Sequence, residues 1–138
     1  MRAINPPGPQ IPGISQAMLI PGGDLLILSG HIPLGPDGIV GDDLTTQLEQ
    51  IFENMAATLR EAGADFSNVA RLTIYVRDYH QDMLPTIRAV RDRYVNLESP
   101  PASALIGVAA LAFPEILVEV DAIAGVPRRA DAVAMTTL

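Results

Sequence analysis

Residues 68–78, NVARLTIYVRD, decide the fold of this chain. Apolar side chains at positions 70, 72, 74 and 76 alternate with Arg71, Thr73, Tyr75 and Arg77. Successive side chains of a β-strand point to opposite faces of its sheet, so the alternation predicts a strand with one face in a core and the other in polar surroundings. The fold must therefore contain a sheet that is covered on one side only.

One helix is predicted before this strand in the sequence and a second helix after it. The first follows Asp42–Asp43, whose carboxylates suit the positive end of a helix dipole, and ends near Gly63, a residue typical of a left-handed cap. The second tolerates Pro85 in its first turn, where backbone donors are free. Apolar residues recur at helical spacing in both segments: Leu44, Leu48, Ile51, Phe52, Met55, Leu59 and Ala62, then Met83, Leu84, Ile87, Val90 and Tyr94.

Shorter apolar stretches predict further strands. Residues 15–20 and 25–32 flank the turn PGGD and are predicted to form a β-hairpin, and a second turn cluster leads to an extended piece at Ile39–Val40. Proline ends the preceding element at Pro100–Pro101. Two apolar strands are predicted after it, at residues 102–109 and 116–124.

The chain is expected to form a single domain over residues 1–138, with an irregular lead-in at 1–13 and a surface tail at 127–138. The order β-β-(β)-α-β-α-β-β predicts an α+β sandwich. Its mixed sheet would have about six strands, with two long helices on one face. Because the chain is too short for a third layer, we expect other copies of it to cover the open face.

The composition excludes several classes of protein. Hydrophobic residues make up 49% of the chain, which argues against disorder, and a net charge of −7 without any lysine argues against nucleic-acid binding. No apolar run reaches the ~20 residues of a membrane span, and the N-terminus lacks a signal-peptide core, so we expect a cytoplasmic protein. The chain has no cysteine, only two histidines, and no phosphate-loop or calcium-loop motif. We therefore expect it to bind neither a cofactor nor a metal ion.

Residue chemistry alone singles out a few candidate groups. Ser29-Gly30-His31 ends a strand without a nucleophile-elbow motif, which favours a strand corner with a hydrogen-bonded histidine over a hydrolytic triad. Glu119 and Asp121 share one face of the last strand; they could act in acid–base catalysis or pair with Arg71 or Arg77, and both alternatives stay open. The pair Arg128–Arg129 is expected to be a solvated end.

The order of the motifs resembles the Rid family, also called YjgF or L-PSP endoribonuclease, over roughly residues 14–126. The most specific pieces are the Ser-Gly-x-Ile-Pro corner, the helix with Gln47 and Asn54, the strand Val-x-x-x-Thr-x-Tyr-Val-x-Asp, the Pro-Ala dipeptide and the ending Val-Glu-Val-Asp-Ala-Ile-Ala. The resemblance implies a chorismate-mutase-like fold, a homotrimer with a central barrel, and pockets between subunits. In the best-known branch of the family, water attacks an imine or enamine and releases ammonia.

The family's site residues map only partly onto this chain. Ser29, Gly30 and Glu119 match the Ser-Gly corner and the glutamate of the last strand, whereas Ser103 stands in place of the arginine that grips the substrate carboxylate, and Ile14 in place of a tyrosine. A serine cannot supply the charged fork of an arginine.

Ser103 and Leu105 alternate onto one strand face, and the resemblance implies that this face looks into the cleft, toward Glu119 and the Ser29–Gly30 corner. One interpretation is a deaminase with an unusual small-molecule substrate, in which Glu119 manages water and His31 or Ser29 contacts the substrate. The alternative is a trimer that binds a small metabolite or a protein partner without catalysis. A ribonuclease is a weaker third interpretation, because the chain is acidic and lacks basic patches.

Overall fold

The structure is a computed structural model that describes residues 1–128. The expected surface tail lies, from residue 129 onward, outside the described residues. The elements, in chain order, are β1 (Arg2–Ile4), β2 (Ala17–Leu19), β3 (Asp24–His31), β4 (Leu34–Gly35), β5 (Gly38–Ile39), α1 (Leu44–Glu61), η1 (Phe66–Asn68), β6 (Val69–Arg77), η2 (Gln81–Met83), α2 (Leu84–Arg91), β7 (Ala102–Val108) and β8 (Val118–Val126).

The main sheet has four strands in the order β3-β8-β6-β7, fewer than the six predicted from the sequence. It is mixed, as expected, because β6 and β7 run parallel while the other neighbours are antiparallel. The predicted hairpin is wrong, since β2 pairs with β1 and β3 pairs with β8. The partner of β2 lies within the lead-in that the sequence predicted to be irregular, at Arg2–Ile4.

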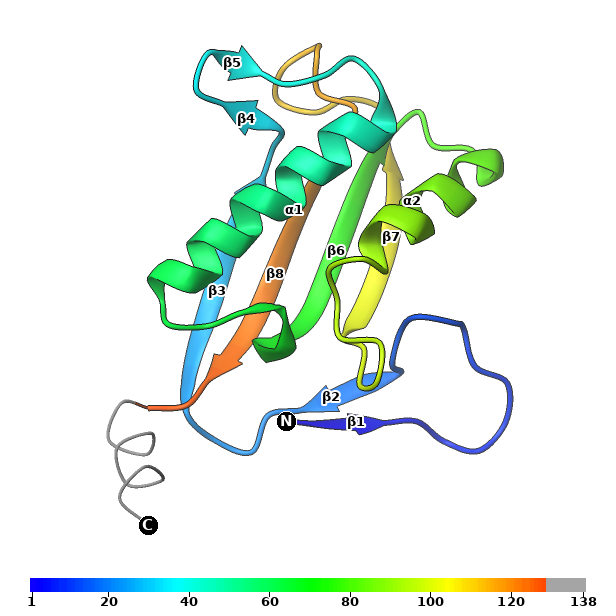
Figure 1. Ribbon diagram of the computed structural model, residues 1–138. Coiled ribbons are helices and arrows are strands. Elements are labelled where there is room, and N and C mark those ends of the chain that lie inside the picture. Colours follow the sequence, from blue (N-terminus) through cyan, green and yellow to red (C-terminus); the bar gives the residue numbers. More distant parts are fainter. Residues whose placement is uncertain (129–138) are drawn as a thin grey trace.

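Both helices lie on one face of this sheet (Figure 1). The long helix α1 begins and ends as predicted: Asp43 caps it by accepting from the Thr46 amide, and Gly63 follows it with φ 73°. Helix α2 is shorter than predicted. It has eight residues and follows a 3-10 turn, and Pro85 lies in its first turn. The buried side chains of both helices and the inner sheet face form one continuous core.

The opposite face of the sheet is largely uncovered within this chain. The alternation in β6 is confirmed from Arg71 onward, since Leu72, Ile74 and Val76 are buried under the helices while Arg71 is exposed on the other side. It is wrong at Ala70, where the register shifts and Val69 takes the place in the core. On the same outer face of edge strand β3, Leu25 and Ile27 are 62% and 70% exposed. Isolated exposed apolar residues are ordinary, but here they lie on a broad sheet face that no helix or strand within residues 1–128 covers.

A buried glutamine fixes the segment that leads into β8. The Gln47 side chain, fully buried in α1, donates to the Gly41 and Glu115 carbonyl oxygens at 3.0 and 2.8 Å and accepts from the Leu117 amide at 2.8 Å. These contacts satisfy backbone groups that neither helix nor sheet pairs. The start of β8 is therefore held in place, and Glu119 follows directly after it.

Candidate functional site

Glu119 lies beside the corner Ser29–Gly30, where strand β3 is irregular. Leu28 pairs with Ala122 and His31 with Val120, so Ser29 and Gly30 together face the single residue Asp121 of β8. Two residues opposite one define a β-bulge, which bends a strand and re-aims its groups. The bulge turns Gly30 toward the carboxylate of Glu119.

The absence of a side chain at Gly30 makes room for this carboxylate. A Cβ atom on Gly30 would stand 2.9 Å from Glu119 Cδ and 3.1 Å from each carboxylate oxygen, closer than carbon atoms normally approach. The φ angle of Gly30 is not in the left-handed region, so the glycine is needed here for space rather than for backbone freedom. Gly30 and Glu119, predicted to share a site, are in contact.

The surroundings of Glu119 on the outer face are polar. Tyr75 of β6 lies opposite Glu119, and its hydroxyl donates to Asp121 Oδ2 at 3.1 Å. This hydrogen bond, with burial and the charge of Asp121 as smaller contributions, raises the pKa of the Tyr75 phenol above 10.0. The phenol is therefore a neutral donor at physiological pH.

The alternative in which arginines neutralise the two carboxylates is not observed. Within residues 1–128, neither Glu119 nor Asp121 forms an ion pair. The guanidinium of Arg77 contacts the Pro114 carbonyl oxygen and Asp78 instead. Arg71 lines a hollow of about 240 Å³ on the outer face together with Ile27, Thr73, Tyr75, Asp121 and Ile123.

Ser103 and Leu105 do not face Glu119 within one chain; the predicted cleft lies between subunits, so their place beside Glu119 stays a prediction. Ser103 pairs with Leu72, which is buried under the helices, and Leu105 packs against the core, so both belong to the helix-covered face. Glu119 pairs with Tyr75 on the outer face. Strands β3 and β7 also form opposite edges of the sheet, so the two halves of the predicted site lie far apart in one protomer (Figure 1).

Ile14 is held at the β7 edge by its two neighbours. Ser15 bridges to Ala102: its amide donates to the Pro101 carbonyl oxygen at 3.1 Å and its hydroxyl to that of Pro100 at 2.5 Å. On the other side of Ile14, Gly13 has φ 80°, in the left-handed region that favours glycine, and lies against the buried guanidinium of Arg91. Ile14 and Ser103 therefore both adjoin the Ser15–Ala102 bridge at the β7 edge.

His31 points away from Glu119, toward helix α1. Its Nδ1 lies 2.7 Å from the Ser29 carbonyl oxygen and its Nε2 lies 2.8 Å from Thr58 Oγ1. Its role as a hydrogen-bonded strand-corner residue agrees with the simpler interpretation of the Ser-Gly-His corner. Sequence reasoning missed Thr58, although Gln50, Asn54 and Thr58 recur at every fourth position of α1 and so mark a polar stripe on one helix face.

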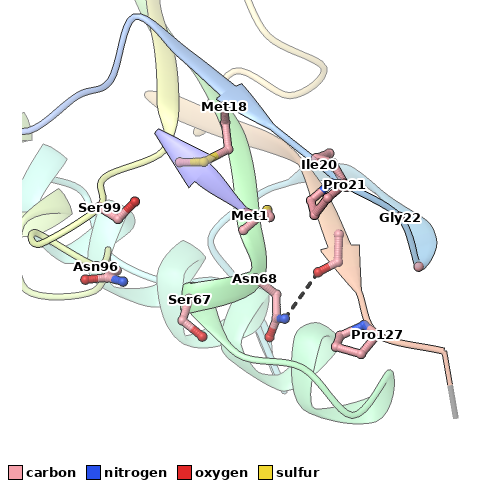
Figure 2. A pocket seen from close by; sticks show the side chains of 12 residues that line it. Met1, Met18, Ile20, Pro21, Gly22, Ser67, Asn68, Asn96, Ser99 and Pro127 are labelled. Atoms are coloured by element: carbon pink, nitrogen blue, oxygen red, sulfur yellow. Dashed lines mark hydrogen bonds between the residues drawn. The ribbon is translucent and has the colours of Figure 1, made fainter. Parts of the chain in front are cut away.

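A hollow larger than the one beside Arg71 lies elsewhere, between the β1–β2 pair and the end of β8 (Figure 2). Its volume is about 390 Å³, and Asn68, which lines it, donates to the Gly125 carbonyl oxygen at 3.2 Å. Among the described residues, no acidic, basic or histidine side chain lines it. This hollow lacks the groups that acid–base chemistry requires, so the carboxylate corner at Gly30 remains the better candidate.

Residues 1–128 support neither a metal site nor a membrane-spanning helix. No cluster of three histidine, aspartate or glutamate side chains there is arranged to hold a metal ion. Neither helix in this part of the chain has the length and apolarity to cross a membrane.

The chain matches the model of the family Endoribonuclease L-PSP over residues 10–126. It is 39% identical to protein DfrA of Myxococcus xanthus, covering 80% of this chain and 82% of that protein. It is 28% identical to a 2-iminobutanoate/2-iminopropanoate deaminase of Salmonella typhimurium, covering 85% of this chain and 87% of that one.

A solved structure supports the same relationship. A Rid-family protein of unknown function, YyfB from Yersinia pestis, has a TM-score of 0.80 at 34% identity, covering 91% of this chain and 98% of that one. The fold and the motifs agree with these matches along most of the chain. The chain belongs to the endoribonuclease L-PSP family, the Rid or YjgF family that its sequence motifs resemble.

Proposed function

We propose that this protein hydrolyses a small reactive imine, or an enamine after its tautomerisation, with Glu119 as the acid–base group. The contact between Gly30 and Glu119 carries the proposal, because it places a carboxylate that has no ion-pair partner among residues 1–128 beside a strand bulge on the open sheet face. The Salmonella typhimurium relative with an imine-deaminase name supports the reaction class.

The proposed reaction needs one group that accepts a proton from water and then donates it to the substrate nitrogen. As water attacks the imine carbon, a C–O bond forms and the water proton passes to the Glu119 carboxylate. The C=N electron pair moves onto nitrogen, which then takes that proton. In the resulting carbinolamine the hydroxyl proton passes through Glu119 to nitrogen, the C–N bond breaks, and ammonia leaves a carbonyl product. A single partly buried carboxylate can serve both steps.

We propose that three copies close into a ring around a central barrel, as the family resemblance implies. Ring closure would bring edge strand β7 of one subunit toward edge strand β3 of the next, since these strands bound the sheet. It would also bury the exposed Leu25 and Ile27. The cleft would then combine Gly30 and Glu119 of one subunit with Ser103 and Ile14 of the other.

The substrate class follows from the charges that this cleft would contain. Ser103 offers a hydroxyl where the best-known branch of the family has an arginine, while Glu119 and Asp121 bring two carboxylates without ion-pair partners in the described chain. A carboxylate-bearing imine would be repelled there, whereas a neutral or protonated imine would be favoured. We therefore propose substrates without a carboxylate, and we expect little hydrolysis of 2-imino acids.

The test compares two imines made in situ. An amine oxidase acting on a simple primary amine gives an imine without a carboxylate, and an amino-acid oxidase gives a 2-imino acid; ammonia release is followed in both, with catalase present. We expect faster release from the amine-derived imine, lost in Glu119→Gln. Faster release only from the 2-imino acid would overturn the substrate class. No acceleration of either would overturn catalysis and leave the non-catalytic binding protein.

The assembly is tested separately by light scattering. We expect a mass three times that of the 14.7 kDa chain. A monomer at micromolar concentration would remove both the ring and the proposed cleft between subunits.

A further inference from the structure

The side chain of His31 connects helix α1 to the bulge that carries Gly30. Nδ1 contacts the carbonyl oxygen of Ser29 at 2.7 Å, and Nε2 contacts Thr58 Oγ1 at 2.8 Å. A carbonyl oxygen can only accept, so Nδ1 carries the proton in the neutral and in the charged imidazole alike. The imidazole therefore makes two distinct hydrogen bonds, one from Nδ1 to Ser29 and one between Nε2 and Thr58, and a substitution can remove either one alone.

The bond to Ser29 falls where the strand ladder is interrupted. Ser29 and Gly30 share one partner position in β8, and the extra residue of a bulge is left unpaired by the ladder. A carbonyl in that position needs another donor to fix its peptide plane. That plane is the one between Ser29 and Gly30, so its orientation also sets the direction of the Gly30 amide beside Glu119.

Helix α1 supplies a rigid support for this link. Asn54 Nδ2 donates to the Ile32 and Leu34 carbonyl oxygens at 3.1 and 2.9 Å, and Gln50 donates to Asn54 Oδ1 at 2.8 Å. With Thr58, these residues form one stripe along the helix. The strand segment after the bulge is thus pinned to the helix at several points, and among these side chains His31 is the one that contacts the bulge itself.

We propose that His31 is a positioning residue of the candidate site: its Nδ1–H holds the Ser29–Gly30 peptide so that the bulge keeps its place against Glu119. The imidazole itself faces α1 and does not touch the substrate. The inference rests on the proposed function in assigning Gly30 and Glu119 to the site. It adds that His31, on the helix-covered face of the sheet, sets the position of Gly30 relative to Glu119.

Two substitutions of His31 each keep one of its two hydrogen bonds and remove the other. In His31→Asn the amide nitrogen takes the place of Nδ1 and keeps the bond to Ser29, whereas in His31→Gln it takes the place of Nε2 and keeps only the bond to Thr58. One hydrogen bond changes an equilibrium constant by a factor of about two to ten. We expect kcat for the amine-derived imine to fall at least fivefold in His31→Gln and to stay within about twofold in His31→Asn, with KM little changed in both.

The other histidine provides the matched control. His80 is largely exposed and pairs with Asp82 at 2.7 Å, remote from the bulge in the chain. His80→Gln and His80→Asn should leave kcat unchanged. Equal losses in His31→Asn and His31→Gln, or no loss in either, would overturn the positioning role.

A second measurement does not depend on activity. In ¹H–¹⁵N spectra of the assembled protein, the Gly30 amide signal should move when Glu119→Gln is introduced, because the two groups are in contact. We expect that movement to shrink by half or more in the His31→Gln background and to persist in His31→Asn. If the protein proves to hydrolyse nothing, this result still decides the role of His31. An unchanged movement in His31→Gln would overturn it.

Discussion

Gly30→Ala should separate activity from stability. The added methyl would stand 2.9 Å from Glu119 Cδ, and carbon atoms are in optimal contact at roughly 3.5–4.0 Å, so the carboxyl must move by at least about 0.6 Å. A misplacement of about 1 Å costs up to ~10²-fold in rate. We therefore expect kcat for imine hydrolysis to fall about tenfold.

The folded state should tolerate the same change. The φ angle of Gly30 lies outside the left-handed region, so alanine can adopt it, and replacing a glycine in such a position restricts the unfolded chain by about 0.4–1 kcal/mol in favour of folding. That gain offsets the displacement of one partly buried side chain. The free energy of unfolding should stay within about 1 kcal/mol of the wild-type value.

Rates, urea unfolding and a double-mutant cycle test these expectations. In a Glu119→Ala background the new methyl meets no carboxyl, so Gly30→Ala should there stabilise the protein by about 0.4–1 kcal/mol. Wild-type activity in Gly30→Ala would refute the claim that Glu119 needs the space beside Gly30. A loss of several kcal/mol in both backgrounds would show that the glycine serves the backbone instead.

Three other changes probe different parts of the molecule. Ser103→Arg should create binding of small keto acids, measured by calorimetry, at least about tenfold tighter than in the wild type; no gain would argue against Ser103 lining the cleft. Gln47→Leu leaves three backbone groups without a partner and should lower the free energy of unfolding by roughly 2–5 kcal/mol in urea, and a change below about 1 kcal/mol would contradict the role of this side chain. The hydrogen bond to Asp121 raises the pKa of Tyr75, so the folded state keeps the phenol proton to a higher pH than the unfolded chain does. The stabilisation of the folded state by this bond is complete below about pH 10 and is lost as the pH rises through the folded-state pKa. Tyr75→Phe should make the decline of stability above about pH 10 shallower, and an identical decline in both proteins would contradict the assignment.

The elements that the sequence predicted well are those with local causes. Helix α1 follows from its apolar spacing, from the cap at Asp43 and from Gly63 after its end. Strand β6 follows from its alternation. The hairpin failed because strand pairing is a tertiary property: the turn at 21–24 is present, but Asp24 pairs with Val126, at the far end of the chain.

The candidate site was only half predictable for a related reason. Glu119 stands out as a carboxylate among apolar strand residues, but its contact with Gly30 depends on a bulge that a single glycine within a strand signals only weakly in the sequence. Strand β7 is small and apolar on both faces, so alternation alone cannot tell which face meets the helices. The face of Ser103 within its own sheet is set instead by its pairing with Leu72.

The order of strands in the sheet has a consequence for how the protein is made. Strand β8 is the last strand of the described chain, yet it lies between β3 and β6, which do not pair with each other. During synthesis on the ribosome, α1 therefore has no continuous sheet to pack on until residues 118–126 have emerged. Earlier folding would leave a gap in the middle of the sheet. A nascent chain interrupted before Val118 has no smaller native form to adopt, and cellular proteases should clear it as unfolded.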